Sequence, residues 1–222
     1  MESLLKLAGV FDRIAKFMGK LAGFVVLPLI AIIMFDVITR KIDFLRIGMS
    51  QLSWYWLIEP IKLQDMQWHL HAVILLLSFG YAYLMNAHVR VDIFREGLSQ
   101  RGQAWVEFWG LLIMAIPYLL LITYFAFVFV SISISQGEGS ESLTGIPMRY
   151  IIKSFTIIGF LLMLIAVLAT FIRICAVLFG SPQNREMALG QLNIFTDEVE
   201  ALLEEGPPPG ADELYIHTAE KD

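Results

Sequence analysis

The sequence contains a single cysteine, Cys175, among its 222 residues. One thiol can form neither an internal disulfide nor a cysteine-based metal cluster. Charged residues make up only 17% of the chain, and the basic ones are scattered along it. Nucleic-acid-binding proteins usually gather basic residues in a patch with interleaved aromatic residues, so we expect no nucleic acid partner.

Histidines are few and poorly placed for chemistry. His69, His71 and His88 belong to one hydrophobic stretch or its ends, and His217 lies near the end of the sequence. On a helix His69 and His71 are about 200° apart, and His71 and His88 are roughly 25 Å apart. This chain therefore cannot supply a bis-histidine haem site between two helices. The sequence also contains no HExxH motif, Walker loop or nucleophile elbow. We expect no cofactor, no metal site and no enzymatic activity.

Long hydrophobic runs are the main feature that is present. Hydrophobic residues make up 57% of the chain and its mean hydropathy is +0.68, whereas soluble domains contain roughly 45–50% apolar residues. Runs of about 20 residues match the roughly 30 Å hydrocarbon core of a bilayer. We therefore expect an all-α membrane protein whose domain 21–179 has four transmembrane helices, at about 21–39, 67–87, 105–130 and 154–173.

Two further helices are expected at the membrane surface. Residues 1–20 combine apolar residues at three- and four-residue spacing with basic residues elsewhere, which is typical of an amphipathic helix in the headgroup plane. A cleaved signal peptide is the alternative, but the hydrophobic run that follows ends without a small-residue cleavage site. The aromatic cluster of Trp54, Tyr55 and Trp56 predicts a short interfacial helix over 50–58. Pro117 predicts a kink in the third span.

The distribution of charge predicts the topology. Residues 180–222 carry ten acidic and two basic residues, so we expect an acidic tail that is partly disordered. With four spans both termini lie on one side, where nine basic residues are close to spans, against six on the other side. The positive-inside rule therefore favours cytoplasmic N- and C-termini.

Polar residues inside the spans suggest helix contacts. His71, Leu75, Ser78, Ala82 and Asn86 fall on one stripe of the second span. Small and weakly polar residues let a neighbouring helix come close, so we expect this face to pack against helices. The same residues would also suit a plain span whose Ser and Asn side chains bond to local carbonyls.

Two other groups of charged residues complete the candidate sites. Asp36 and Arg40 are four residues apart near the end of the first span, which predicts a structural ion pair. The connections 42–62 and 136–149 would share the outer side of the membrane. Their charges set the orientation and rate of an encounter with a soluble partner more than its affinity. The candidate docking residues are Arg46, Lys62, Glu138, Glu141 and Arg149.

Three separated segments resemble one family. They are DVITRK (36–41), LQDMQWHLHAVILLLSFGYAYLMNAHVRVDIF (63–94) and ESLTGIPMRYIIKSFTIIGFLLML (141–164). Together with the four-span pattern they resemble the small permease (Q-type) subunit of TRAP (tripartite ATP-independent periplasmic) transporters, over about residues 20–180. The long 42–65 connection and the QWHLHA motif resemble the branch labelled mannitol/chloroaromatic-type.

The resemblance implies a function and partners. The chain would be a scaffold for the large TRAP permease subunit in the bilayer of the bacterial inner membrane. It would also help to dock a periplasmic substrate-binding protein during sodium-coupled uptake of an organic acid. The alternative is a structural membrane-anchor subunit of a membrane enzyme complex. The resemblance does not extend to the acidic tail.

Overall fold

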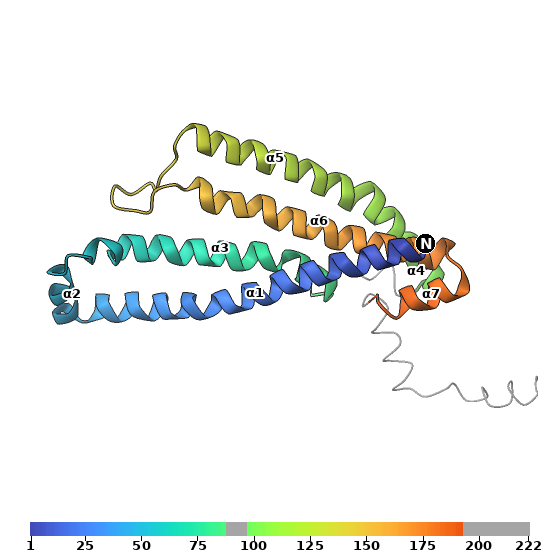
Figure 1. Cartoon of the computed structure of the whole chain (residues 1–222), viewed down its shortest axis with the longest axis horizontal. Coiled ribbons are helices and arrows are strands. Elements are labelled where there is room, and N and C mark those ends of the chain that lie inside the picture. The colour runs from blue at the N-terminus through green and yellow to red at the C-terminus, as the bar shows by residue number, and fades with distance from the viewer. Residues whose placement is uncertain (88–96, 193–222) are drawn as a thin grey trace, which may run out of the picture.

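The computed structural model describes residues 1–87 and 97–192. Within these ranges the chain is helical and contains no strand, as the composition predicts (Figure 1). In chain order the helices are α1 (Glu2–Lys41), α2 (Asp43–Ser50), α3 (Pro60–Leu84), α4 (Gln100–Trp109), α5 (Ile116–Ser135), α6 (Tyr150–Phe179) and α7 (Pro182–Leu189). A 3-10 turn at Tyr55–Leu57 and a π-helical turn at Gly110–Ala115 complete the described elements.

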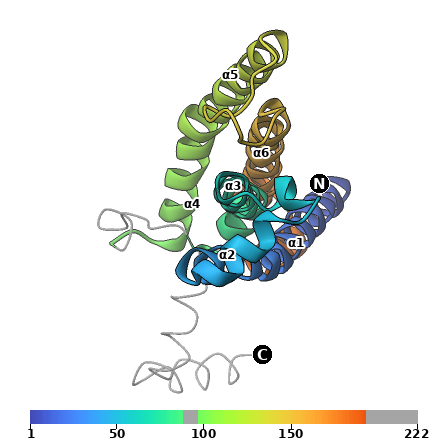
Figure 2. The same cartoon turned by 90° about the vertical axis from the view of Figure 1, so that its left-hand side faces the viewer.

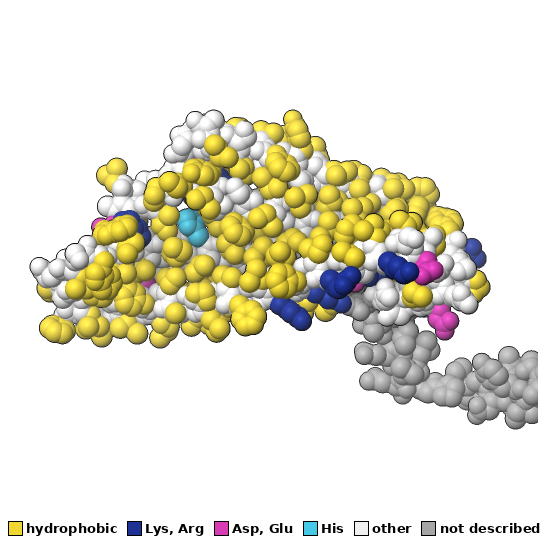
Figure 3. Space-filling model, in the orientation of Figure 1, with side chains coloured by type: hydrophobic (Ala, Val, Ile, Leu, Met, Phe, Trp, Pro, Cys, Tyr) yellow, Lys and Arg dark blue, Asp and Glu magenta, His cyan; other side chains and the backbone are white. Residues whose placement is uncertain are grey.

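Three described helices are long and apolar enough to cross a membrane. They are α1, the continuous helix Gln100–Ser135 and α6. Helix α3 is less apolar because its first half contains Gln67, His69 and His71. Its 25 residues nevertheless extend about 37 Å, and it lies alongside the long helices (Figure 1). Hydrophobic side chains cover the middle of the visible surface, and most charged ones lie towards the two ends (Figure 3).

Helices α1, α3 and α6 form a closely packed core, because each contacts the other two. Buried residues of α1 recur every seven positions at Ala8, Ala15, Ala22, Leu29 and Asp36. This spacing follows a left-handed supercoil, and the alanines allow close approach of the neighbouring helices.

A glycine allows close contact between all three core helices. A Cβ atom at Gly80 of α3 would lie 2.6 Å from the carbonyl oxygen of Leu162 in α6 and 3.4 Å from the Cβ of Ala15 in α1. A side chain at this position would push the three helices apart.

Helix α5 stands apart from this core. It packs mainly against α6 and leans away at one end (Figures 1 and 2). Pro117 lacks the amide proton of a regular turn, and its ring clashes with the carbonyl four residues earlier. The π-helical turn Gly110–Ala115 directly precedes it. A π-bulge is a recognised cause of a helix bend, and the helix curves here (Figure 1).

Two expected elements differ in the structure. Residues 1–20 and 21–39 form one continuous helix, α1, because the small residues that face the core continue unbroken across Lys20. The helix expected at 50–58 instead occupies Asp43–Ser50, and only Tyr55–Leu57 forms a 3-10 turn. Asp43 in the first turn favours this earlier start, since an acid there interacts well with the helix dipole. The tail from residue 193 onward lies outside the described residues.

Candidate partner-docking surface

The candidate surface lies at one end of the bundle, which we call the loop end. It comprises α2, the connection up to α3 and the loop 136–149 between α5 and α6 (Figure 1). The opposite end holds the N-terminus, α4 and α7 (Figure 1). The two connections expected to share a side of the membrane therefore do lie at the same end.

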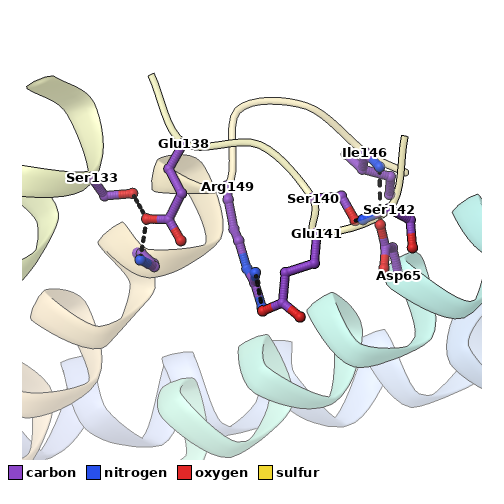
Figure 4. A network of polar contacts seen from close by, with 9 residues as sticks. Asp65, Ser133, Glu138, Ser140, Glu141, Ser142, Ile146 and Arg149 are labelled. Carbon is purple, nitrogen blue, oxygen red and sulfur yellow. Dashed lines mark hydrogen bonds and ion pairs between the residues drawn. The ribbon is translucent and has the colours of Figure 1, made fainter. Parts of the chain in front are cut away.

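Glu138 holds the loop against α5 and α6. Its backbone N–H donates to the carbonyl of Ser133 at 3.1 Å, and its carbonyl accepts the backbone N–H of Arg149 at 2.9 Å. Its carboxylate accepts hydrogen bonds from Lys153 and from the hydroxyl of Ser133, the latter at 2.7 Å (Figure 4). The hydrogen bond from Lys153, followed by the one from Ser133, lowers the pKa of Glu138. The carboxylate of Glu138 is therefore occupied by contacts within this chain.

Asp65 holds the loop against α3. One of its carboxylate oxygens, Oδ2, accepts the backbone N–H of Ile146 at 3.0 Å (Figure 4). Gly145 allows this approach, since a Cβ there would collide with Ser140 and with the carboxylate of Asp65. Neither Asp65 nor Gly145 was among the predicted docking residues, because the contact between Asp65 and Ile146 joins positions 81 residues apart.

The outer part of the loop presents groups that remain accessible. Arg149 Nη1 donates to Glu141 Oε1 at 3.2 Å (Figure 4), with side-chain exposures of 38% and 90%. Leu143 is fully exposed at 107%. An apolar side chain beside an exposed ion pair resembles the mixture of apolar contact and charged rim found in protein interfaces.

A cavity of about 530 Å³ lies beneath this part of the loop. It is bounded by α3, by the loop and by the start of α6, and its polar lining includes Asp65, His69, Glu141, Arg149 and Lys153. These side chains carry both signs of charge, so the cavity shows no preference for a cation or an anion.

The other two predicted docking residues differ in accessibility. Arg46 pairs with Asp43 at 3.0 Å, and both side chains are exposed. Lys62 donates to the carbonyl of Trp56 at 2.6 Å and lies 3.4 Å from a carboxylate oxygen of Glu59. Its ammonium group also lies 5.3 Å from the ring centroid of Trp56. Lys62 therefore fixes the connection, whereas Arg46 stays on the surface.

Asp36 joins two helices. Arg40 Nε donates to Asp36 Oδ1 at 2.8 Å, and Gln67 of α3 donates to Asp36 Oδ2 at 3.2 Å. Arg40 also donates to the carbonyl of Pro60 at 3.2 Å. The four-residue spacing indicated the pair itself, but it gave no sign of Gln67 or Pro60.

The predicted packing stripe of α3 is only partly covered within the chain, since Ser78, Ala82 and Asn86 are half-buried. Leu77 and Gly80 are buried, whereas His71 and Leu75 are exposed. Ser78 donates to the carbonyl of Leu75 at 2.9 Å. Packing of this stripe against a partner helix remains a prediction.

Asn86 departs from the helix on which the stripe was drawn. Helix α3 ends at Leu84, and Asn86 has a positive φ of 53°. The N–H of Ala87 bonds to the carbonyl of Ala82 at 2.9 Å, and that of Asn86 to Tyr83 at 3.1 Å. Asn tolerates this left-handed conformation, which commonly ends helices. Asn86 therefore terminates α3 and does not extend its face.

A buried ion pair at the other end of the bundle was not predicted. Arg173 of α6 is 2% exposed. It binds both carboxylate oxygens of Asp12 in α1, at 3.1 and 2.6 Å, and its Nε donates to Gln191 at 3.2 Å. The partners are 161 residues apart, so no local spacing reveals them.

The described residues contain no group of three His, Cys, Asp or Glu side chains that could hold a metal ion. The arrangement is one of hydrogen bonds and ion pairs that order a surface.

Comparison with known proteins decides the family. Residues 29–176 match the family model of tripartite ATP-independent periplasmic transporters, DctQ component, which covers two thirds of the chain. The chain belongs to the DctQ family. No curated protein and no solved structure matches it. A DctQ component is a transporter component and not an enzyme. It is the small membrane subunit of a tripartite system with a large permease and a substrate-binding protein.

Proposed function

We propose that this DctQ component scaffolds the large permease in the bacterial inner membrane and helps to dock the substrate-binding protein. In this proposal α3 also crosses the membrane, in addition to the three longer helices, so the chain has four spans and both termini lie on one side. By the positive-inside rule that side is the cytoplasm, and the loop end faces the periplasm. The transport is sodium-coupled uptake of an organic acid, in the branch labelled mannitol/chloroaromatic-type. The resemblance of residues 36–41, 63–94 and 141–164 supports these finer assignments.

One observation carries the docking proposal. Glu138 and Asp65 fix the loop 136–149 against the helices, yet Glu141, Leu143 and Arg149 remain accessible to solvent. A surface that is ordered before binding loses less entropy when a partner arrives. Exposed charges steer the encounter, and an exposed leucine supplies apolar contact.

Uptake that depends on the binding protein tests this proposal. Glu141→Lys combined with Leu143→Ser should slow uptake, because it alters the exposed charge and the apolar contact without removing the support from Glu138. Glu2→Lys is the matched control, since Glu2 is also an exposed acid in an ion pair but lies at the opposite end. Co-purification with the large subunit should be unchanged in both variants.

Ionic strength separates docking from a general defect. The loss in the loop variant should be larger at low salt, where exposed charges are less screened. Uptake equal to wild type at both low and moderate salt would show that the loop only connects α5 and α6.

A further inference from the structure

The first half of α1 has three faces. Ala8, Ala15 and Ala22 face the helix core and are buried. A second face carries exposed apolar side chains, including Phe17 at 62%. The third carries Arg13, Lys16 and Lys20, which we call the basic stripe and which are all exposed. At positions i, i+3 and i+7 the three cations follow one side of the helix.

The cations of the basic stripe have no acidic partner among the described residues. Arg13 Nε makes only a long contact of 3.4 Å to the carbonyl of Gly9. Asp12 is the only acidic residue between Glu2 and Asp36, and it points inward to Arg173. The inward ion pair thus uses the one acid that lies in α1 between Glu2 and Asp36.

The stripe lies where a bilayer would place its phosphates. Residues 21–35 carry no charge, so the hydrocarbon region of α1 begins beside Lys20. Along the helix axis, Arg13 lies about 10 Å further from the hydrocarbon region than Lys20 does. Each headgroup layer is roughly 5–7 Å thick. Dark-blue Lys and Arg side chains gather beside hydrophobic ones along the lower edge of the molecule, in the region of α1 (Figure 3). The continuous α1 thus carries the stripe across the headgroup layer.

We propose that Arg13, Lys16 and Lys20 form a binding site for anionic phospholipid headgroups. Arginine binds phosphate oxygens in a bidentate manner, and the two lysines add point charges. The neighbouring exposed Phe17 and Phe24 suit acyl chains, whereas a soluble acidic partner would have to cover them with its own surface. This site is independent of the transporter assignment and of docking at the loop end.

Native mass spectrometry of the full-length chain in detergent tests the site, with phosphatidylglycerol and phosphatidylcholine as the titrated lipids. Each basic residue near an anionic surface contributes about fivefold in affinity, so R13Q/K16Q/K20Q should weaken phosphatidylglycerol binding by about a hundredfold. Phosphatidylcholine binding should not change. R13K/K16R/K20R keeps the charges and should restore the affinity for phosphatidylglycerol.

Two controls make the outcome decisive. Lys6→Gln removes an exposed base of the same helix that is already paired with Glu2, and it should leave lipid binding unchanged. The second control tests whether the acidic segment 193–222, which has nine acids and one base, binds the basic stripe in place of lipid. D197N/E198Q/E200Q should leave phosphatidylglycerol affinity unchanged. A gain in affinity would show that the tail occupies the stripe, and equal binding by R13Q/K16Q/K20Q and wild type would also overturn the proposal.

Discussion

Two ion pairs at opposite ends of the helix bundle differ in their burial. At the N-terminal end, Arg173 and Asp12 expose only 3% and 15% of their side chains and join α6 to α1. At the loop end, Arg149 and Glu141 expose 38% and 90%. A buried pair cannot be broken without leaving an uncompensated charge, whereas an exposed pair is worth little and can exchange partners. The buried pair therefore serves the fold, and the exposed pair is free to serve a partner.

The largest expected effect is on the buried pair. Asp12→Ala should lower the free energy of unfolding by about 3–5 kcal/mol, because it leaves Arg173 buried without its carboxylate. Unfolding of the purified chain in detergent, followed by circular dichroism, measures this loss. Replacing both residues by leucine should recover much of the stability. A loss as small as that of an exposed pair would remove the distinction between the two ends.

A glycine substitution tests the core that connects the ends. Gly80→Ala should destabilise the chain by about 1–3 kcal/mol, since the new Cβ overpacks the contact and would lie 2.6 Å from the carbonyl oxygen of Leu162. Gly23→Ala in α1 is the matched control, because a Cβ there meets nothing within 4 Å. Thermal unfolding of both variants measures the difference. Equal effects would contradict the close packing of α1, α3 and α6.

The pH dependence of stability tests the support beneath the loop. Hydrogen bonds from Lys153 and Ser133 lower the pKa of Glu138 from its ordinary value of 4.5. A carboxylate with a lowered pKa in the folded state contributes stability that is fully present above 4.5 and is lost as pH falls through the folded-state pKa. The stability difference between wild type and Glu138→Gln should therefore shrink below pH 4.5. If the stability difference between the two proteins stayed constant below pH 4.5, the hydrogen bonds to Glu138 would not contribute to stability as described.

The smallest expected effect on stability is at the exposed pair. Glu141→Gln should change the free energy of unfolding by less than about 1 kcal/mol, because solvent screens the interaction. Chemical denaturation compares it with Asp12→Asn, which alters the buried pair in the same conservative way. A large loss for Glu141→Gln would mean that the outer loop is structural, and the proposed docking role would lose its basis.

Much of the fold follows from local patterns. The hydrophobic runs predict the long helices, and the i, i+4 spacing indicates the contact between Asp36 and Arg40. Contacts between distant segments have no such signature, so Gln67 at Asp36 and Asp12 at Arg173 could not be predicted. The seven-residue repeat of Ala8, Ala15 and Ala22 was the one available signal for the core face of α1.

The docking residues illustrate the same limit. Sequence places Glu138 and Glu141 in one exposed loop and cannot distinguish them. The structure separates them because Lys153 and Ser133, on two neighbouring helices, both donate to Glu138. Asn86 shows the converse problem, since a helical wheel assumes that the helix continues, and α3 ends at Leu84.

The orientation of the two ends is the central claim, and cysteine labelling tests it most directly. Gly139 lies in the loop 136–149 and Gly190 follows α7 at the opposite end. Each is replaced by cysteine in a Cys175→Ala background, and intact cells are treated with a membrane-impermeant maleimide. We expect Gly139→Cys to be labelled from outside and Gly190→Cys to be labelled only after the membrane is permeabilised. Labelling of Gly190→Cys but not of Gly139→Cys in intact cells would contradict the periplasmic loop end.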